Sequence, residues 1–483
     1  MSTPVKPRGR YARLLTNTAV FSAGKLLSKL LVFFMTRLYT AYLTPADYST
    51  ADLIANMANL LIPLACVGIS EGIFRNAAAK EGDKEAFFTN GLVVLGAGSL
   101  LFLGGTLVYL FLSPLFNFFS FLKDSVWLVV LYVLSANLHS VVAQYLCAVG
   151  RTKLFAAQGI LNTALVIGLN VLFLPVFDWG VTGYILSTVI ADLLTTLFLV
   201  LFTRLWRAVK PRSISWGTIR TMLRFCLPLV PTTIFWWITG VSDRYMVAQM
   251  QSPEVNGLYT AAYKIPTLLI YAVGIFDSAW KLSVSAEDDP ETCRAFYSKV
   301  WRVYTTVAFL GGGVLMLSSR LFAALLFDSS YTDAWVYIPL LTVATVFTAM
   351  DTFLGSVYFT GRKTMWSMIT ALVGAGLNVA LNLLLIPAYS AMGASIATFV
   401  AYFVVFILRL ITVRRLIPFR QEPGRWIINT VLSLLLAGAV TLTVGDHGGV
   451  MWGVACILFV AMVTVNARAV LEVLRSGKAL IGR

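Results

Sequence analysis

The sequence predicts an all-α membrane protein of about 14 transmembrane helices, and its composition and hydropathy both lead to that class. Of 483 residues, 58% are hydrophobic and only 12% are charged, and the mean hydropathy is +0.81. Soluble domains are less apolar and about twice as charged, which excludes a water-soluble fold. Because one bilayer crossing takes about 20 apolar residues, the apolar runs supply a dozen or more helices.

The individual helices follow from apolar runs of about 18 or more residues that end at proline, glycine or clustered charges. The first run contains Lys25 and Lys29 but continues to about Leu43, so an uncleaved helix is expected rather than a signal peptide. The predicted spans are residues 14–42, 48–74, 87–113, 125–148, 154–174, 181–203, 222–246, 255–280, 297–319, 334–360, 364–386, 392–413, 427–444 and 450–467.

Basic residues occur in every second loop between these spans. Lys and Arg accumulate in short cytoplasmic loops and avoid the outer ones. With the N-terminus inside, the inner loops hold pairs such as Arg151 with Lys153 and Arg362 with Lys363, whereas an outer loop holds Asp178. Both termini are therefore placed in the cytoplasm. The chain has 37 Lys+Arg against 22 Asp+Glu. Because this excess of positive charge lies in the loops between spans, we attribute it to membrane topology and expect no nucleic acid partner.

A repeat of about 210 residues relates two halves of the chain, with an even number of predicted helices between equivalent positions. Recurring positions are Arg151, Asn170 and Pro175 in the first half and Arg362, Asn382 and Pro387 in the second. The prediction is two six-helix repeats in the same orientation: an N-lobe at 1–213, a C-lobe at 214–420, and two C-terminal helices with a cytoplasmic tail at 421–483. Paired lobes predict a transporter with a site between them near the midplane; a structural bundle is the alternative.

Lys25 and Lys29 are the most informative pair in the sequence. At 1.5 Å per residue, Lys25 lies roughly 16 Å into the first span, near the middle of a core about 30 Å thick. The two lysines share one helix face, and each costs about 3 kcal/mol at that depth. A water-filled cavity that receives an anion would accommodate them. Pairing with buried acids such as Asp52 or Glu71 is the alternative.

Three further cations complete the candidate substrate site. Lys264 lies inside the eighth span, and convergence of the three lysines on one cavity is our hypothesis, with a diphosphate as counter-ion. Arg37 and Arg244 hold equivalent places near the outer ends of spans one and seven. For these two arginines the alternatives are contact with lipid headgroups and, for Arg244, pairing with the adjacent Asp243.

Polar residues on later spans suggest a place for a coupling ion. Asn378 and Asn382 lie one turn apart on span eleven, and Thr398 follows on span twelve. Together with an acid such as Asp243, their oxygens could hold a hard monovalent cation; ordinary interhelical hydrogen bonding is the alternative. His139 on span four is expected to be a packing or network residue.

Sequence motifs give little support for catalysis. The chain has no Gly-x4-Gly-Lys-Ser/Thr, no His-Glu-x-x-His and no Cys-x-x-Cys, and only two histidines. One Gly-x-Ser-x-Gly occurs, at Gly68–Gly72, but it lies inside a predicted membrane span rather than after a strand. We therefore expect a secondary transporter with no catalytic residues, metal centre or cofactor, apart from coupling to Na+ or H+. An intramembrane glycosyltransferase is kept as an alternative.

Four stretches carry a family resemblance. They are Leu43–Tyr48, Val67–Arg75, Tyr259–Ile265 and Gly361–Lys363. The chain resembles bacterial polysaccharide flippases of the multidrug/oligosaccharidyl-lipid/polysaccharide (MOP) exporter superfamily, relatives of the lipid II and O-antigen flippases. The resemblance implies a two-lobed, V-shaped transporter with alternating access. It also implies export of a lipid-linked saccharide, usually on undecaprenyl diphosphate, across the plasma membrane.

The resemblance also implies roles for particular residues. In relatives that move lipid-linked sugars, basic residues on helices one, two and eight line the cavity. Lys25, Lys29 and Lys264 match helices one and eight, whereas helix two offers only Arg75 at its end.

Sodium-linked lipid II flippases place ion ligands on helices seven, eleven and twelve. Asn378, Asn382 and Thr398 resemble the part of that set on the last two helices. Asparagine at 382, where a carboxylate is common, is expected to weaken cation affinity.

The function expected from the sequence is export of an undecaprenyl-diphosphate-linked oligosaccharide for surface polysaccharide assembly, with assembly enzymes as candidate partners. One rival is the lipid II flippase of peptidoglycan synthesis. Another is a multidrug exporter of the same superfamily, although cavity lysines would repel organic cations.

Overall fold

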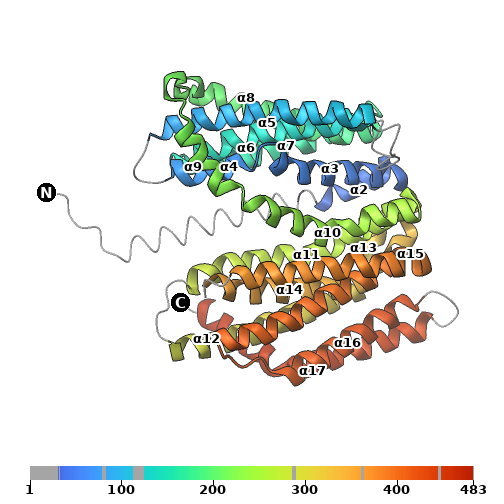
Figure 1. Cartoon of the computed structure of the whole chain (residues 1–483). Coiled ribbons are helices and arrows are strands. Elements are labelled where there is room, and N and C mark those ends of the chain that lie inside the picture. The colour runs from blue at the N-terminus through green and yellow to red at the C-terminus, as the bar shows by residue number, and fades with distance from the viewer. Residues whose placement is uncertain are drawn as a thin grey trace. The chain divides into compact units, whose positions relative to one another are not determined.

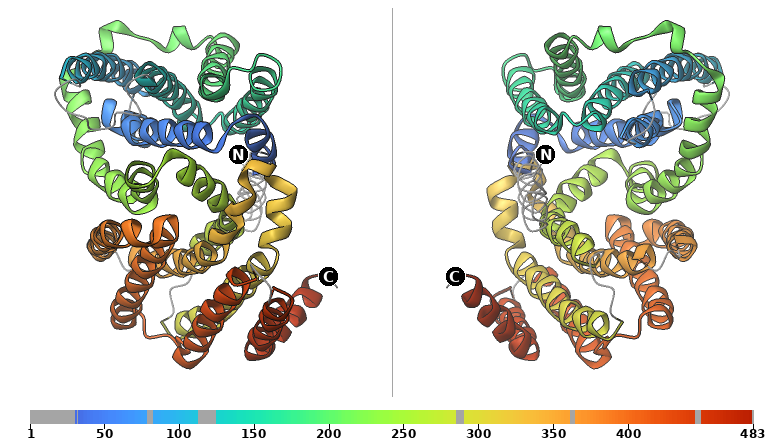
Figure 2. Two further views of the ribbon diagram at one scale, coloured as in Figure 1. Left: turned by 90° about the vertical axis from the view of Figure 1, so that its right-hand side faces the viewer. Right: turned by 90° about the vertical axis from the view of Figure 1, so that its left-hand side faces the viewer.

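The computed structural model describes residues 31–481 except 32, 79–82, 113–124, 285–289, 361–363 and 444–447 (Figure 1). The described residues form helices joined by short connections and contain no strand. The chain divides into two compact units, Met1–Trp237 and Ile238–Arg483. Figure 2 views the helices of each unit nearly along their axes.

In the first unit, α6 is the central helix. It packs against α3, α4, α5, α7 and α8, and its buried side chains include Val133 and Val141. The elements are α2 (Thr36–Tyr42), α3 (Pro45–Ala65), α4 (Ile69–Ala77), α5 (Lys84–Leu112), α6 (Val126–Ala148), α7 (Thr152–Phe173), α8 (Gly180–Thr203), η2 (Leu205–Ala208), η3 (Pro211–Ser213), α9 (Trp216–Cys226) and the start of α10 (Leu229–Met250).

In the second unit, α14 is the central helix. It packs against α11, α12, α15 and α16, and Phe347, Phe353 and Val357 on it are fully buried. The elements after α10 are α11 (Pro253–Val284), α12 (Pro290–Leu317), α13 (Ser319–Leu326), η4 (Ser329–Tyr337), α14 (Ile338–Thr360), α15 (Thr364–Leu416), α16 (Pro423–Thr441) and α17 (Gly448–Ile481).

A bend of 56° separates α3 from α4, although the sequence predicts one continuous span over 48–74. Val67 and Gly68 take φ values of 52° and 60° there, a left-handed conformation that ends a right-handed helix. Hydropathy stays high across the bend, so the predicted span passed over Pro63 and Gly68, the two residues beside the break. The neighbouring helix α5 comes very close at this point, since a Cβ on Gly98 would lie 2.4 Å from the carbonyl oxygen of Ala65.

The single stretch α15 is a helical hairpin. Ser390 breaks it with φ 54° and ψ −142°, three residues after Pro387. Asn378 donates a hydrogen bond to Thr398 at 3.4 Å, whereas 20 residues of straight helix would separate them by about 30 Å. The two arms therefore run antiparallel, as expected for the separate spans predicted at 364–386 and 392–413.

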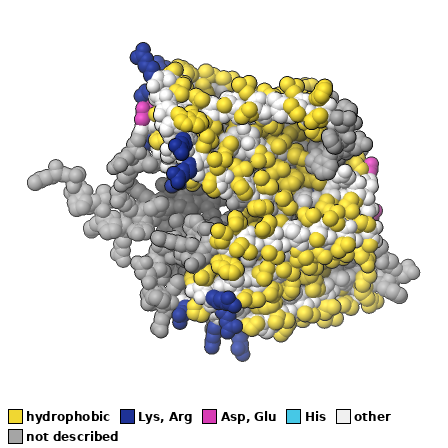
Figure 3. All heavy atoms as spheres, viewed as in Figure 1, with side chains coloured by type: hydrophobic (Ala, Val, Ile, Leu, Met, Phe, Trp, Pro, Cys, Tyr) yellow, Lys and Arg dark blue, Asp and Glu magenta, His cyan; other side chains and the backbone are white. Residues whose placement is uncertain are grey.

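The protein is an all-α, multi-pass membrane protein. Among the described residues, ten helices are long and apolar enough to cross a membrane, or eleven if the bent α3–α4 pair is one span. Hydrophobic side chains cover most of the face shown in Figure 3, and Lys and Arg gather near helix ends. Each predicted span from 48–74 onward has a helical counterpart, whereas most of the first span, 14–42, lies outside the described residues.

Candidate functional site

Asp243 lies at the centre of a buried polar cluster in the second unit. Only 2% of this residue, on α10, is exposed. One carboxylate oxygen, Oδ2, accepts a hydrogen bond from the hydroxyl of Tyr259 on α11 at 2.6 Å and one from the hydroxyl of Thr398 on α15 at 3.4 Å. The other oxygen, Oδ1, accepts from the backbone N–H of Arg244 at 2.9 Å.

The cluster continues along α15 through two buried amides. Asn378 donates to the Thr398 hydroxyl at 3.4 Å, and its side-chain oxygen accepts from Asn382 at 2.9 Å and from the hydroxyl of Ser242 at 3.4 Å. Asn378, Asn382 and Thr398 are each at most 1% exposed. The hairpin of α15 is what makes this contact, because it returns Thr398 to the level of Asn378.

All four residues predicted as an ion site therefore meet in one cluster. We name Asp243, Asn378, Asn382 and Thr398, with Tyr259, the Asp243 cluster. It offers one negative charge and several neutral oxygens in a buried place. The Oδ1 atom of Asn382 is buried and has no hydrogen-bond partner among the described residues. A buried acceptor without a donor is costly unless a ligand satisfies it.

The donor set fits a small, hard, singly charged cation. Carboxylate, amide and hydroxyl oxygens suit such ions, whereas a transition metal would require imidazole or thiolate ligands. Among the described residues, no group of three or more His, Cys, Asp or Glu side chains could hold a metal ion. A cation bound there would share the Asp243 carboxylate with Arg244, the next residue along α10, which also acts on it electrostatically.

Tyr259 is the member of the cluster that sequence reasoning missed. It is fully buried, and its hydroxyl donates to Asp243 at 2.6 Å, a shorter bond than the one from Thr398 at 3.4 Å. The tyrosine begins the stretch Tyr259–Ile265 that carries the family resemblance, but the resemblance assigns no role to the tyrosine itself. No periodicity on α11 distinguishes this tyrosine from a packing residue.

The predicted cationic site falls largely outside what the structure describes. Lys25 and Lys29 lie in the undescribed N-terminal stretch, so their convergence with Lys264 stays a prediction. Lys264 lies on α11 and is half-buried, and Arg37 on α2 is exposed. Arg244 is half-buried on α10, with its guanidinium carbon 4.9 Å from the centre of the Tyr263 ring, a distance suited to a cation–π contact.

A second polar cluster joins α12, α16 and α17. Arg425 on α16 donates to the backbone oxygen of Arg302 at 3.0 Å and to hydroxyls of Thr305 and Thr306 on α12. It also reaches Asn466 on α17 at 3.2 Å and forms an ion pair with Glu422 at 2.9 Å. We name this set the Arg425 network. The hydrogen bonds of this network fasten α16 and α17 to α12.

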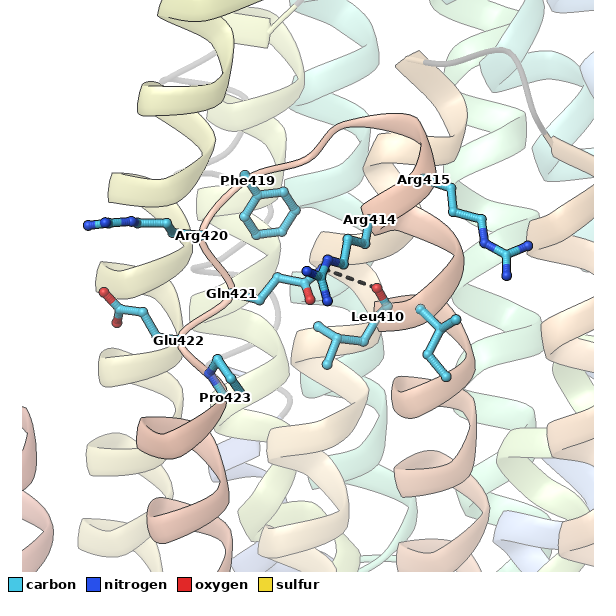
Figure 4. A pocket seen from close by; sticks show the side chains of 9 residues that line it. Leu410, Arg414, Arg415, Phe419, Arg420, Gln421, Glu422 and Pro423 are labelled. Carbon is cyan, nitrogen blue, oxygen red and sulfur yellow. Dashed lines mark hydrogen bonds between the residues drawn. The ribbon is translucent and has the colours of Figure 1, made fainter.

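A pocket of about 920 Å³ lies beside this network, where the chain passes from α15 to α16. Gln421 crosses it and donates to the carbonyl oxygen of Leu410 at 3.0 Å. In Figure 4, the side chains of Arg415 and Arg420 point away from each other rather than toward a common centre. The pocket is therefore not built as a cradle for one anion.

Several solved structures share this architecture. The "lipid II flippase MurJ, inward closed conformation" superposes with a TM-score of 0.69 at 14% sequence identity, over 94% of this chain and 99% of that one. An inward-facing MATE family multidrug transporter of the MOP superfamily gives 0.64 at 16% identity, over 80% and 95% of the two chains. A MOP superfamily transporter from Pyrococcus furiosus gives 0.57 at 16% identity, over 84% and 95%. At these identities the likeness concerns the fold.

Sequence comparison gives the family. No curated protein matches the chain. The polysaccharide biosynthesis protein family, in contrast, matches residues 14–280, more than half of the sequence. With the fold of MOP superfamily transporters in place, the chain belongs to the polysaccharide biosynthesis protein family.

Proposed function

We propose that the protein is a flippase that moves an undecaprenyl-diphosphate-linked oligosaccharide from the inner to the outer face of a bacterial plasma membrane. The observation that carries this proposal is the family match over residues 14–280. The fold alone would serve drugs and lipids equally, since it is shared with MATE transporters and with MurJ. A polysaccharide biosynthesis family favours a lipid-linked sugar, used for surface polysaccharide assembly.

The headgroup contacts in this proposal come from intramembrane cations. A diphosphate carries negative charge into the membrane, and lysines in a wet cavity offset that charge. Lys25 and Lys29 in the first span and Lys264 on α11 are the residues we assign to it. Arg37 and Arg244 are assigned to the outer part of the path. No chemical step is needed, so the protein acts as a secondary transporter and not as an enzyme.

In this proposal the Asp243 cluster binds the coupling ion. Sodium bound among Asp243, Asn378, Asn382 and Thr398 would neutralise the carboxylate and satisfy the orphan oxygen of Asn382. An ion that binds one conformation better than another shifts the equilibrium between them. Sodium binding thereby links the ion gradient to alternating access. In the proposed topology both termini are cytoplasmic, and the basic inner loops face the enzymes that assemble the substrate.

A lipid II flippase is the second candidate, because MurJ is the similar structure that covers 94% of this chain. Complementation separates the two. A strain depleted of its own lipid II flippase grows with this protein only if lipid II is a substrate. We expect no growth.

The deciding experiment is depletion of the protein in its host, followed by mass spectrometry of lipid-linked sugars. We expect an undecaprenyl-diphosphate oligosaccharide to accumulate on the inner side. The double variant Lys25→Glu with Lys29→Glu should cause the same accumulation. The matched control reverses two charges in inner loops, Lys84→Glu with Lys153→Glu, and should still export. Normal export by the Lys25/Lys29 variant would contradict the cationic headgroup site, and accumulation of lipid II alone would select the second candidate.

A further inference from the structure

Three helices of the first unit bring a histidine and a carboxylate together. His139 lies on α6, Asp192 on α8, and the helix between them in sequence, α7, contributes Gln158 and Asn162. His139 Nδ1 is 3.4 Å from Asp192 Oδ1. His139 Nε2 is 2.9 Å from Gln158 Oε1, and Asn162 donates to Asp192 Oδ1 at 2.7 Å. We name these four residues the His139 cluster.

The positions of His139 along α6 and of Asp192 along α8 place the cluster in the interior of the membrane. His139 is 13 residues from the start of α6, and Asp192 is 12 from the start of α8, which spans Gly180–Thr203. At 1.5 Å per residue both lie about 18–20 Å from those helix ends, near the middle of a bilayer core about 30 Å thick. Ionisable residues at such a depth are costly and commonly mark ion pathways.

In the orientation that the structure gives the Gln158 amide, the cluster is one proton short. With the amide oxygen of Gln158 facing Nε2, the imidazole donates there, so a neutral ring presents a lone pair at Nδ1. That lone pair would face the Asp192 carboxylate, which also only accepts. His139 Nδ1 is buried and has no hydrogen-bond partner among the described residues. A proton between Nδ1 and Oδ1 removes the conflict.

The charge count favours the same state. A neutral imidazole with an ionised Asp192 leaves one uncompensated negative charge in the membrane, which is costly. Uptake of one proton from water gives a neutral pair, with the proton on Nδ1 and shared with Oδ1. On release, rotation of the Gln158 amide presents its N–H₂ to Nε2, and the neutral ring then donates from Nδ1 to Asp192. Gln158 can therefore satisfy both protonation states without moving the helices.

We propose that His139 and Asp192 form a proton-binding pair in the first unit, a site distinct from the Asp243 cluster. About 15% of the histidine side chain and 13% of the aspartate side chain remain accessible, so the pair is reachable. Its use as a second coupling ion in transport rests on the proposed function, whereas the proton site rests on this geometry alone.

Other titratable groups on the packed helices differ in position or pairing. Tyr132 on α6 lies within electrostatic reach of Asp192. On α3, the carboxylate of Asp52 accepts from Asn56 at 2.8 Å, and Asp47 lies in the first turn. The remaining charged residues are exposed or near helix ends: Glu71 and Arg75 on α4, Lys84 and Glu85 on α5, Lys153 on α7 and Arg204 after α8.

The protein has only two histidines, His139 and His447, which makes a direct test practicable. The full-length protein, labelled with ¹³C,¹⁵N-histidine in lipid nanodiscs, is titrated from about pH 5 to pH 9 by NMR, a range centred near the titration of imidazole. His447→Gln assigns the second signal. We expect the His139 ring to change protonation within that range. Asp192→Asn, which keeps the side-chain shape, should lower the proton occupancy of the ring, because the carboxylate that balances the charged imidazole is removed.

Asp351→Asn is the matched control, because Asp351 is also a buried acid within a spanning helix but lies on α14 in the second unit. It should leave the His139 titration unchanged. A His139 ring that keeps one protonation state across the range, or a midpoint that ignores Asp192→Asn, would overturn the proton site. The titration uses no lipid-linked substrate, so a failed transport assay with a normal titration would reject the proposed function and leave the proton site standing.

Discussion

Asp192 in the first unit and Asp243 in the second are both largely buried carboxylates, and their neighbours differ in kind. Asp243 accepts from the hydroxyls of Tyr259 and Thr398 and lies within electrostatic reach of Arg244. In the first, Asp192 faces an imidazole, the side chain whose charge changes most readily near neutral pH. In our proposals, hydroxyl and amide neighbours suit Asp243 to a metal cation, whereas the imidazole suits Asp192 to a proton. On that basis the neighbours of the acid, rather than the acid itself, would select the ion in each unit.

The sharpest way to break this comparison is to remove each charge in turn and measure sodium binding. Asp243→Asn should weaken binding of ²²Na⁺ to the purified protein about a thousandfold, since a unit charge pair near 4 Å is worth about 4 kcal/mol at an effective dielectric of 20. Asp192→Asn should leave sodium affinity within about twofold, because the sites are independent. Equal losses in the two variants would show that the sites are not distinct.

The Arg425 network provides a reference for a polar cluster that only holds helices together. Arg425→Leu should lower the free energy of unfolding by about 3 kcal/mol, because the hydroxyls of Thr305 and Thr306 lose their donor and Glu422 keeps only Arg302 as its ion-pair partner. The measurement is thermal unfolding in detergent with and without sodium. The sodium-induced stabilisation should match that of the wild type.

The control for that variant is Lys210→Gln, which removes an exposed ion pair with Glu85 and should leave the melting temperature unchanged. A loss of sodium response in Arg425→Leu would mean that the network takes part in ion binding.

A substitution at Asn382 that should strengthen sodium binding tests the same comparison. Asn382→Asp places a second acceptor opposite the side-chain oxygen of Asn378, which now accepts from Asn382 at 2.9 Å. Two acceptors need a cation between them, so sodium affinity should rise about tenfold, or 1.4 kcal/mol. Sodium should also raise the melting temperature more than it does in the wild type. Unchanged affinity would place the ion away from Asn382.

The smallest expected effect is at Thr398, whose hydroxyl donates to Asp243 and accepts from Asn378. Thr398→Val keeps the shape and removes the hydroxyl, so sodium affinity should fall about fivefold, in keeping with about 1 kcal/mol for one hydrogen-bonding group. Thr370→Val on the first arm of the same hairpin is the control, since that hydroxyl binds Arg409 instead. A larger loss in the control would assign the effect to the hairpin and not to the ion.

The helices could be predicted from the sequence because apolar length is a direct requirement of the bilayer. The α3–α4 bend was not predicted, although Pro63 and Gly68 lie beside it, because hydropathy stays high across the left-handed residues Val67 and Gly68. The hairpin turn of α15 was predicted, as separate spans at 364–386 and 392–413, because Pro387 and a glycine at 393 interrupt the run.

The site was predictable where local spacing carried it. Asn378 and Asn382 share a helix face by their separation of four, and the resemblance pointed to Thr398 on the next span. Tyr259 was missed, because its face of α11 is defined only by the fold. His139 was expected to be a packing or network residue. Its partner Asp192 is on another helix, and single-helix periodicity does not tell which faces of two helices meet.

The helix that carries Asp243 begins in one unit and ends in the other. Trp237, the last residue of the first unit, donates from its indole to the backbone oxygen of Asn56 on α3 at 2.8 Å, and Asp243 follows six residues later, about 9 Å along the same helix. Gly240 lies between them with open space around it, at the place where such a rod bends most readily. One continuous helix thus carries both an indole that is hydrogen-bonded within the first unit and the buried carboxylate of the second.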